Sequence, residues 1–304
     1  MKKELSQNKK RTIFITLMII FPLIQFAIFT VYVNVKTLIM AFFGFDYETN
    51  EVVFVGLENF KRFIIEFQTS DMWKRAIVNS FWYFPVSAFV TLPITVVVSY
   101  FLYNKVYLSS FFKVVFYIPN IISVVVLALV FRAMFNYSSG PVNLILMNVF
   151  NMPIEEIPIW FNDTKVTMKL LYVYAVWAGI GGNVILTLGA MARVPKEVCE
   201  AGQLDGVGMT RELCQIYLPI IWPTVSTFIV FGVASMFSMF IHTAVLTDGA
   251  GDSYTVASII MTKVKEGKNP YYVAMLSLLL TIVAVPVTQL AKYLVNKIWS
   301  DVEV

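Results

Sequence analysis

The hydrophobic residues of this 304-residue chain fall into long uninterrupted runs separated by shorter polar stretches. A helix needs about 20 apolar residues to cross the hydrocarbon core of a bilayer. Six runs reach this length, at roughly 12–34 (continuing as an amphipathic stretch to about Gly44), 77–103, 110–134, 168–192, 217–246 and 271–295. The runs do not alternate as barrel strands would, and helices are the other way to satisfy a backbone in lipid. The pattern predicts an all-α integral membrane protein with six transmembrane helices.

The composition agrees with this pattern. Hydrophobic residues make up 58% of the chain and charged residues 14%, against about 45–50% and about 25% in soluble domains. A water-soluble protein of this size would have too little charge to cover its surface, and a disordered chain would hold far fewer apolar groups. The only two cysteines, Cys199 and Cys214, exclude a disulfide scaffold and are expected to be free thiols without a role.

The first eleven residues decide the predicted orientation. Against a single acid, Glu4, they carry the basic residues Lys2, Lys3, Lys9, Lys10 and Arg11. By the positive-inside rule this end is cytoplasmic, and six spans return the carboxyl end to the same side. Of the 23 Lys and Arg residues, 12 lie on the inner side, five of them in this tail, and 11 on the outer side, so the prediction depends on this tail. We expect a multi-pass protein of the cell membrane, with a cytoplasmic tail at 1–11 and one membrane domain over 12–304.

Three longer segments lie outside under this topology, at about 45–76, 135–167 and 247–270. The first mixes aromatic residues with both signs of charge, which favours an amphipathic segment lying along the membrane surface. The second contains several prolines and the third several glycines. No internal repeat or flexible linker divides the chain.

Chemical groups that would support an enzyme are scarce. No Asp or Glu lies inside a predicted span, and the single histidine is His242. Proton-driven carriers usually need a buried carboxylate or a histidine relay, and a histidine near a helix end is more often a packed residue. The sequence also lacks a G-x-x-x-x-G-K-[ST] phosphate loop, a metal-ligand cluster and a nucleophile–base pair. We therefore expect no catalytic residue, metal or cofactor in this chain.

The most informative polar stretch is the loop between the fourth and fifth runs, at about 194–219. Pro195 suits the first turn of a helix, Asp205-Gly206 breaks it, and Thr210 is expected to cap the next helix. Apolar residues line one face of each helix: Val198, Ala201 and Leu204 on the first, and Leu213, Ile216 and Tyr217 on the second. Such a capped helical knob is suited to dock into a groove of another protein. The alternative is a short amphipathic helix lying on lipid headgroups.

The same loop resembles the EAA motif of ABC importer permeases, which reads E-A-A, three residues, G, nine residues, I, one residue, L-P. The chain has Glu200-Ala201-Gly202, Gly206, Ile216 and Leu218-Pro219 at these spacings, and Gly202 replaces the second alanine. Weaker similarities elsewhere are Gly56-Leu57-Glu58-Asn59-Phe60, Asn79-Ser80, Ile118-Pro119 and Gly140 with Asn143. Together they resemble the type I sugar-uptake permeases, the family for maltose, glycerol phosphate and oligosaccharides.

The resemblance implies a mechanism and a set of partners. Two permease subunits form the pathway, two ATPase subunits each receive one EAA helix and bind ATP and Mg²⁺, and an extracellular binding protein delivers the solute. The carboxyl end lacks the basic, glycine-rich ending of the smaller maltose-type permease, which implies a heterodimer. Glu200 is expected to pair with a basic group of the ATPase, and Gly206 to serve the turn. The implied coupling residues are Glu200, Ala201, Gly202, Leu204, Asp205 and Gly206.

A sugar site needs aromatic faces and hydrogen-bonding groups, so polar or glycine-rich positions inside the spans are the candidates. They are Asn120, Trp177, Gly179, Gly182, Asn183, Ser235, Met236 and Met239. In maltose-type permeases several matching positions belong to the sugar-contacting neighbourhood, with amides at Met236 and Met239 and an aromatic at Gly182. These departures imply a wider, less polar cavity. The alternative is helix packing, the commoner role of glycine and serine in spans, and Trp177 fits it equally.

The combined expectation is a permease subunit that forms half of the translocation pathway for a carbohydrate, above all an oligosaccharide. It would couple to ATPases through the EAA loop. One alternative is a secondary transporter or channel subunit that is not coupled to ATP, and another is a membrane scaffold without a transport role. Binding of an ATPase to the loop at 196–219 separates the first two readings.

Overall fold

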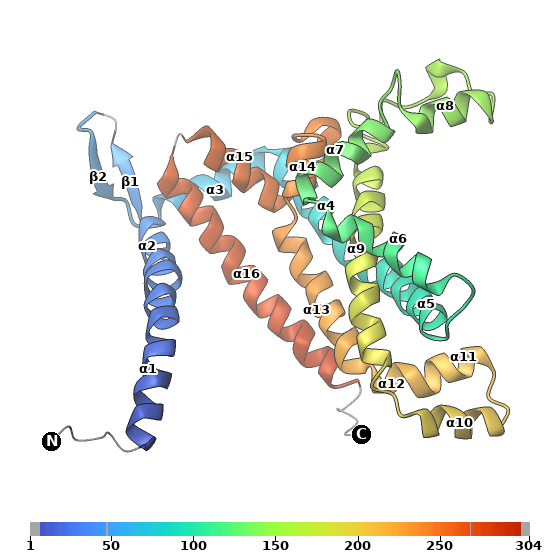
Figure 1. The fold of residues 1–304 in the computed structure, drawn as a ribbon. Coiled ribbons are helices and arrows are strands. Elements are labelled where there is room, and N and C mark those ends of the chain that lie inside the picture. Colours follow the sequence, from blue (N-terminus) through green and yellow to red (C-terminus); the bar gives the residue numbers. More distant parts are fainter. Residues whose placement is uncertain (1–6, 47, 268, 299–304) are drawn as a thin grey trace. The chain divides into compact units, whose positions relative to one another are not determined.

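The computed structural model describes residues 7–46, 48–267 and 269–298. The described chain is mostly helical (Figure 1), which confirms the predicted fold class apart from one short hairpin. It forms two compact units. One comprises the residues up to Glu66 together with Lys263–Thr281, and the other comprises Phe67–Thr262 and the residues from Ile282 onward. Three helices belong partly to each unit: α3 (Glu58–Thr69), α15 (Val256–Glu266) and α16 (Pro270–Asn296).

The first unit begins with a long apolar rod, built from α1 (Gln7–Gln25), η1 (Phe26–Tyr32) and α2 (Val33–Met40). The stretch Lys9–Met40 is long and apolar enough to cross a bilayer, and none of it is buried in this chain. The predicted first span and most of its continuation therefore form one helix, but the continuation ends at Met40, because Phe43 and Gly44 belong to a strand. Of the predicted tail, residues 1–6 lie outside the described residues, and the remainder belongs to α1.

A β-hairpin follows, which the hydropathy pattern did not predict. Its antiparallel strands are β1 (Phe43–Asp46) and β2 (Glu51–Phe54). Asn59, buried at the start of α3, holds the hairpin to the rod, because its amide donates to the carbonyl oxygens of Ala41 and Phe43 at 3.0 and 2.8 Å. The segment expected to be amphipathic, at 45–76, is thus part of a hairpin followed by helices.

Two long spans form the centre of the second unit. The elements α4 (Asp71–Val86), η2 (Ser87–Thr91) and α5 (Leu92–Tyr103) follow one another without a break, and α9 (Thr167–Met191) packs beside them. The Ser99 hydroxyl donates to the carbonyl oxygen of Val184 at 3.3 Å, which ties α5 to α9. These elements match the predicted second and fourth spans.

The predicted third and fifth spans are wrong as continuous helices. The helices α6 (Ser109–Ile121) and α7 (Val124–Met134) meet at 106°, and Met209–Ile220 meets α13 (Trp222–Ser238) at 80°. The backbone is extended at Ile122 in the first break. Pro219 and Pro223 flank Ile221 in the second, and each removes a backbone donor from the helix ladder. The described residues hold four unbroken apolar helices, or six spans if each bent pair counts as one.

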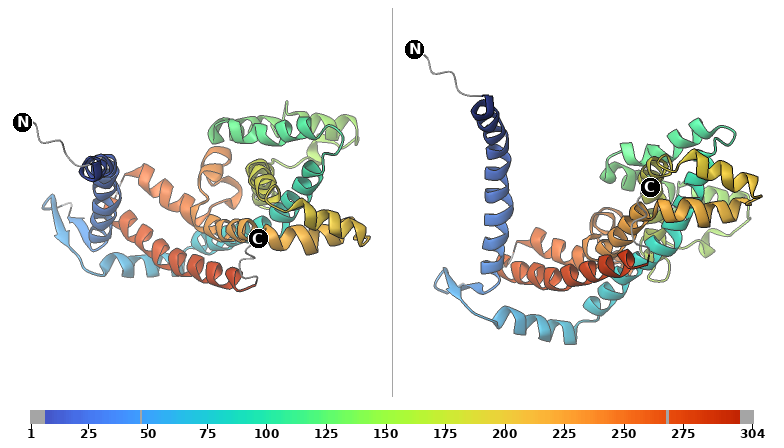
Figure 2. Two further views of the ribbon diagram at one scale, coloured as in Figure 1. Left: turned by 60° about the horizontal axis from the view of Figure 1, so that its bottom comes forward. Right: turned by 90° about the horizontal axis from the view of Figure 1, so that it is seen from below.

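Shorter elements complete the second unit. They are α8 (Pro141–Asn148), η3 (Ile154–Glu156), α10 (Lys196–Leu204), α11 (Met209–Arg211), η4 (Glu212–Tyr217), α12 (Leu218–Ile220), α14 (Ile241–Leu246) and η5 (Ala250–Asp252). The fifth span stops short of the predicted residue 246, because the chain leaves the helix after Ser238 and α14 starts anew. Figure 2 shows α10 lying beside the stretch from α11 to α12.

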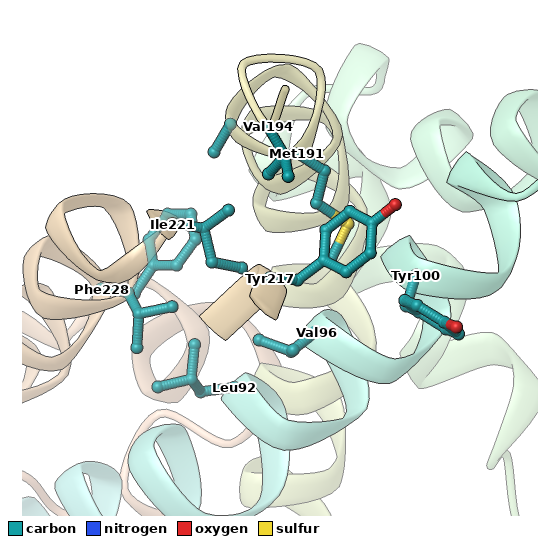
Figure 3. Packing of buried hydrophobic residues seen from close by; sticks show 10 residues of the cluster. Leu92, Val96, Tyr100, Met191, Val194, Tyr217, Ile221 and Phe228 are labelled. Carbon is teal, nitrogen blue, oxygen red and sulfur yellow. The ribbon is translucent and has the colours of Figure 1, made fainter. Parts of the chain in front are cut away.

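A hydrophobic cluster fixes the place where this pair of short helices leaves the spans. Figure 3 shows its labelled members, which are Leu92, Val96 and Tyr100 from α5, Met191 at the end of α9, Val194 just after it, and Tyr217, Ile221 and Phe228. Each of these side chains is less than a tenth exposed. The ends of α5, α9 and α13 are therefore packed together at the base of the loop.

Candidate functional site

The loop at 194–219 is a helix, a turn and a second helix, as predicted. Pro195 takes the N-cap position of α10, which ends at Leu204. Gly206 then adopts a left-handed backbone (φ 70°), a conformation that costs glycine little. The predicted cap at Thr210 is wrong. Gly208 takes that position, because its carbonyl accepts from the Glu212 N–H at 3.0 Å and closes the first turn two residues earlier.

One face of α10 is left uncovered by this chain. Val198 is 42% exposed and Leu204 is 89% exposed, and Ala201 between them is exposed as well. Glu200 and Asp205 are also exposed. The predicted apolar stripe therefore does not pack against the described residues of this chain, and it lies next to acidic groups.

The opposite face of α10 packs on η4. Gly202 is buried there, and a Cβ at this position would lie 2.8 Å from Ile216 Cδ1. The Val207 N–H donates to the Gly202 carbonyl at 2.9 Å and closes the end of the helix. Glycine in place of the EAA alanine thus permits a close contact between the two halves of the loop. Cys199 Sγ lies 3.5 Å from the Tyr217 hydroxyl, and both cysteines are free thiols.

A cavity of about 170 Å³ lies between α4, η2, α9 and α13. Four of the predicted solute residues line it: Gly179, Asn183, Ser235 and Met239. The other lining residues were not predicted, and they are Tyr83, Val86, Ser87, Thr91, Ala175, Phe228, Phe231 and Gly232. Aromatic rings and small polar groups therefore share one hollow inside the membrane domain.

The structure places the other four predicted solute residues away from the lining of this cavity. Asn120 lies against Gly181 and Gly182 of α9, and a Cβ at Gly182 would come within 2.7 Å of its Oδ1. Trp177 stacks on Phe131 with 5.8 Å between ring centroids. Met236 is half-buried on α13. The contact of Asn120 and the stacking of Trp177 are helix-packing contacts; a role in solute contact stays a prediction for all eight residues.

His242 and possible metal ligands are the groups to consider for acid–base and metal chemistry in the described chain. The His242 ring packs edge-on against Tyr174 at 4.7 Å between centroids, and its Nδ1 has no hydrogen-bond partner among the described residues. The same residues contain no group of three or more His, Cys, Asp or Glu side chains placed to hold a metal ion. His242 is thus part of the packing between α9 and α14.

Comparison with known proteins identifies relatives with one shared role. No family model matches the chain. It is 27% identical over 225 residues to the arabinooligosaccharide permease AraP of Bacillus subtilis, covering 73% of this chain and 68% of AraP. AraP of Halalkalibacterium halodurans is 26% identical over 246 residues, covering 81% and 75%. MalF of Escherichia coli, a maltose/maltodextrin permease, is 26% identical over 144 residues, covering 47% of this chain and 27% of MalF.

The fold is shared with a solved transporter chain. A bacterial ABC transporter that imports alginate contains a chain that matches with a TM-score of 0.81 at 20% identity, covering 96% of this chain and 98% of that one. In sequence and in fold, this chain is similar to the permease subunits of ABC importers. The predicted resemblance is thereby confirmed, and so is the expectation of a transport subunit rather than an enzyme, because the relatives are permease subunits. The permease is also a membrane protein, as its relatives are.

Proposed function

We propose that this permease forms one half of the pathway of a binding-protein-dependent importer whose solute is an oligosaccharide. The sequence relatives are named for arabinooligosaccharides and for maltose and maltodextrin. The solved neighbour is also known in complex with a periplasmic protein that holds an alginate pentasaccharide. The sugars in these names differ, but each of them is a short chain of linked sugar units.

The chemistry of the cavity supports a carbohydrate. Phe228 and Phe231 offer apolar ring surfaces, and Ser87, Thr91 and Asn183 offer hydrogen-bonding groups, the combination that sugar sites use. Its volume of about 170 Å³ is below the roughly 300–1,000 Å³ of ordinary ligand sites. A second permease subunit facing this one would supply the remaining wall.

The uncovered face of α10 is the observation that carries the coupling proposal. Leu204 is 89% exposed and lies on the same helix as the exposed Glu200. Its side chain would gain hydrophobic stabilisation, and Glu200 an ion pair, in a groove that combines an apolar floor with a basic rim. We assign this groove to an ATPase subunit, which binds the ATP and Mg²⁺. The amino and carboxyl ends and the 194–219 loop would then all lie in the cytoplasm, as the basic tail predicts.

Affinity purification of this chain from its native membrane in mild detergent tests the proposal. Mass spectrometry of the complex is expected to find a P-loop ATPase, a second six-span permease and an associated sugar-binding protein. Recovery of the chain alone, under conditions that keep a known importer intact, would contradict it. That outcome would favour the carrier that is not coupled to ATP.

A further inference from the structure

The 194–219 loop is joined to the walls of the cavity in unequal ways. It begins at Val194, just after the end of α9 at Met191, and after Ile220 it continues into α13, so two walls are covalently bonded to it. The third wall, formed by α4, η2 and α5, has no such bond to the loop. Motion of the loop reaches that wall through the wall's packing on α9, which includes the Ser99–Val184 hydrogen bond, and through direct side-chain contacts with the loop.

Tyr100 on α5 makes a polar contact between this third wall and the loop. Its hydroxyl donates a hydrogen bond to a carboxylate oxygen of Glu212, the first residue of η4. A hydrogen bond to a charged acceptor is roughly twice as strong as one between neutral groups. Tyr100 is buried and Glu212 is half-buried, so water competes poorly for the bond.

Tyr217, at the other end of η4, adds a second contact. Its ring meets Tyr100 edge to face at 5.4 Å between centroids and meets Tyr103 at 5.8 Å. Figure 3 shows the rings of Tyr217 and Tyr100 at the same end of the hydrophobic cluster. Since the Tyr217 hydroxyl also touches Cys199 of α10, unbroken contacts run from α10 through Tyr217 to α5.

The third wall carries these contacts to the cavity. Thr91 lines the cavity at the end of η2 and Tyr100 lies further along α5, at a separation of about 14 Å along the helix axis. A helix of this length moves as a stiff unit, so a shift at Tyr100 is felt at Thr91. In addition, η4 is a π-helical turn, a geometry that is frequent at functional sites.

We propose that Tyr100 and Glu212 are positioning residues for transport: their hydrogen bond, supported by Tyr217, makes the wall of α4, η2 and α5 move with the loop. The inference rests on the proposed coupling of the loop to ATPases. When the loop moves, the two covalently bonded walls follow, and the hydrogen bond brings the third wall with them. Without it, ATP hydrolysis continues while the cavity changes shape incompletely.

The test uses the whole importer, purified through this chain and reconstituted with its binding protein in proteoliposomes. The probes are labelled arabinotriose and maltotriose, and the measured quantity is sugar imported per ATP hydrolysed. Tyr100→Phe keeps the ring and removes the hydroxyl. We expect the ratio to fall about 10-fold, with ATPase association and melting temperature as in the wild type. Tyr103→Phe is the matched control, because the Tyr103 hydroxyl has no hydrogen bond to the described residues; it should keep the wild-type ratio.

Variants at Glu212 complete the cycle. Glu212→Ala should match Tyr100→Phe, and combining the two should lower the ratio no further, because both remove the same bond. Glu212→Gln keeps an oxygen that accepts from Tyr100 and should restore most of the ratio.

Two results with Tyr100→Phe would overturn the proposal. One is an unchanged ratio of import to ATP hydrolysis. The other is loss of ATPase association, which would make the tyrosine a structural residue. A wild-type assembly that lacks an ATPase, or that imports neither trisaccharide, would instead count against the proposed function.

Discussion

The helix α10 leaves part of its apolar surface uncovered, whereas the contact between α6 and α9 is tightly packed. On α10, Val198 and Leu204 are left uncovered, and the helix is held by one packed face on η4. Where α6 meets α9, Gly181 is buried so closely that a Cβ would overlap the carbonyl of Phe116. The first region leaves apolar surface uncovered, which we propose an ATPase subunit covers, whereas the second contributes its contacts to this fold. Substitutions on the exposed face of α10 should therefore change function while leaving the fold intact, whereas a substitution at Gly181 should disturb the fold itself.

Gly181→Ala should have the largest effect. Its methyl group would overlap the backbone of Phe116 and come within 2.6 Å of Asn120 Nδ2, and a backbone cannot swing aside as a side chain can. Overpacking typically costs about 1–3 kcal/mol, and we expect the upper end, seen as a lower melting temperature and less monodisperse protein in detergent. Gly189→Ala on the same helix meets nothing within 4 Å and should melt like the wild type. Equal melting of both variants would contradict the account of this contact.

Glu200→Lys should abolish solute-stimulated ATP hydrolysis of the complex while leaving the permease folded. The side chain is exposed, so reversing its charge costs the fold little, but it places like charges together at the proposed basic rim. ATP hydrolysis with and without loaded binding protein measures the effect. Glu156→Lys is the control, because Glu156 is also exposed but lies in η3, within the segment predicted to face outside. Normal stimulation in Glu200→Lys would remove this residue from the coupling surface.

Gly206→Ala should have the smallest effect of the three. Its Cβ would meet nothing within 4 Å, but the residue has φ 70°, where an L side chain costs about 1–2 kcal/mol. We expect ATPase affinity to fall by less than about 30-fold, measured by titrating the ATPase against the permease. Gly208→Ala faces the same open space at φ −73° and should bind normally. A similar loss in both would show that the left-handed turn is not the cause.

Local signals were sufficient to predict the helix, turn and helix of the 194–219 loop. Pro195 and Asp205-Gly206 act on their own neighbourhood, so the helix and its end follow from a few adjacent residues. Hydropathy, in contrast, is indifferent to direction. It stays high through Ile122 and Ile221 although the helix axis turns at both, and only Pro219 and Pro223 signalled the second bend. The hairpin was missed because its strands are four residues each.

The cavity was predictable only in part, because it is made by packing between distant segments. Gly179 and Asn183 were found since they interrupt an apolar run. Ser87 and Thr91 were missed, although two small polar residues four apart share one face of a span and were a usable signal. Trp177 shows the limit of residue type, because its ring meets Phe131.

The 80° bend at Ile221 changes the direction of a force that is applied to the loop. The stretch from α11 to α12 meets α13 almost at a right angle, so a push along its length shifts the foot of α13 sideways and hardly moves it along its own axis. A helix displaced at one end tilts, which changes the width of the cavity beside it while each residue keeps its depth in the bilayer. In a straight fifth span, the same push would move the helix along its own axis. Apolar side chains at one end would then move out of the bilayer toward water.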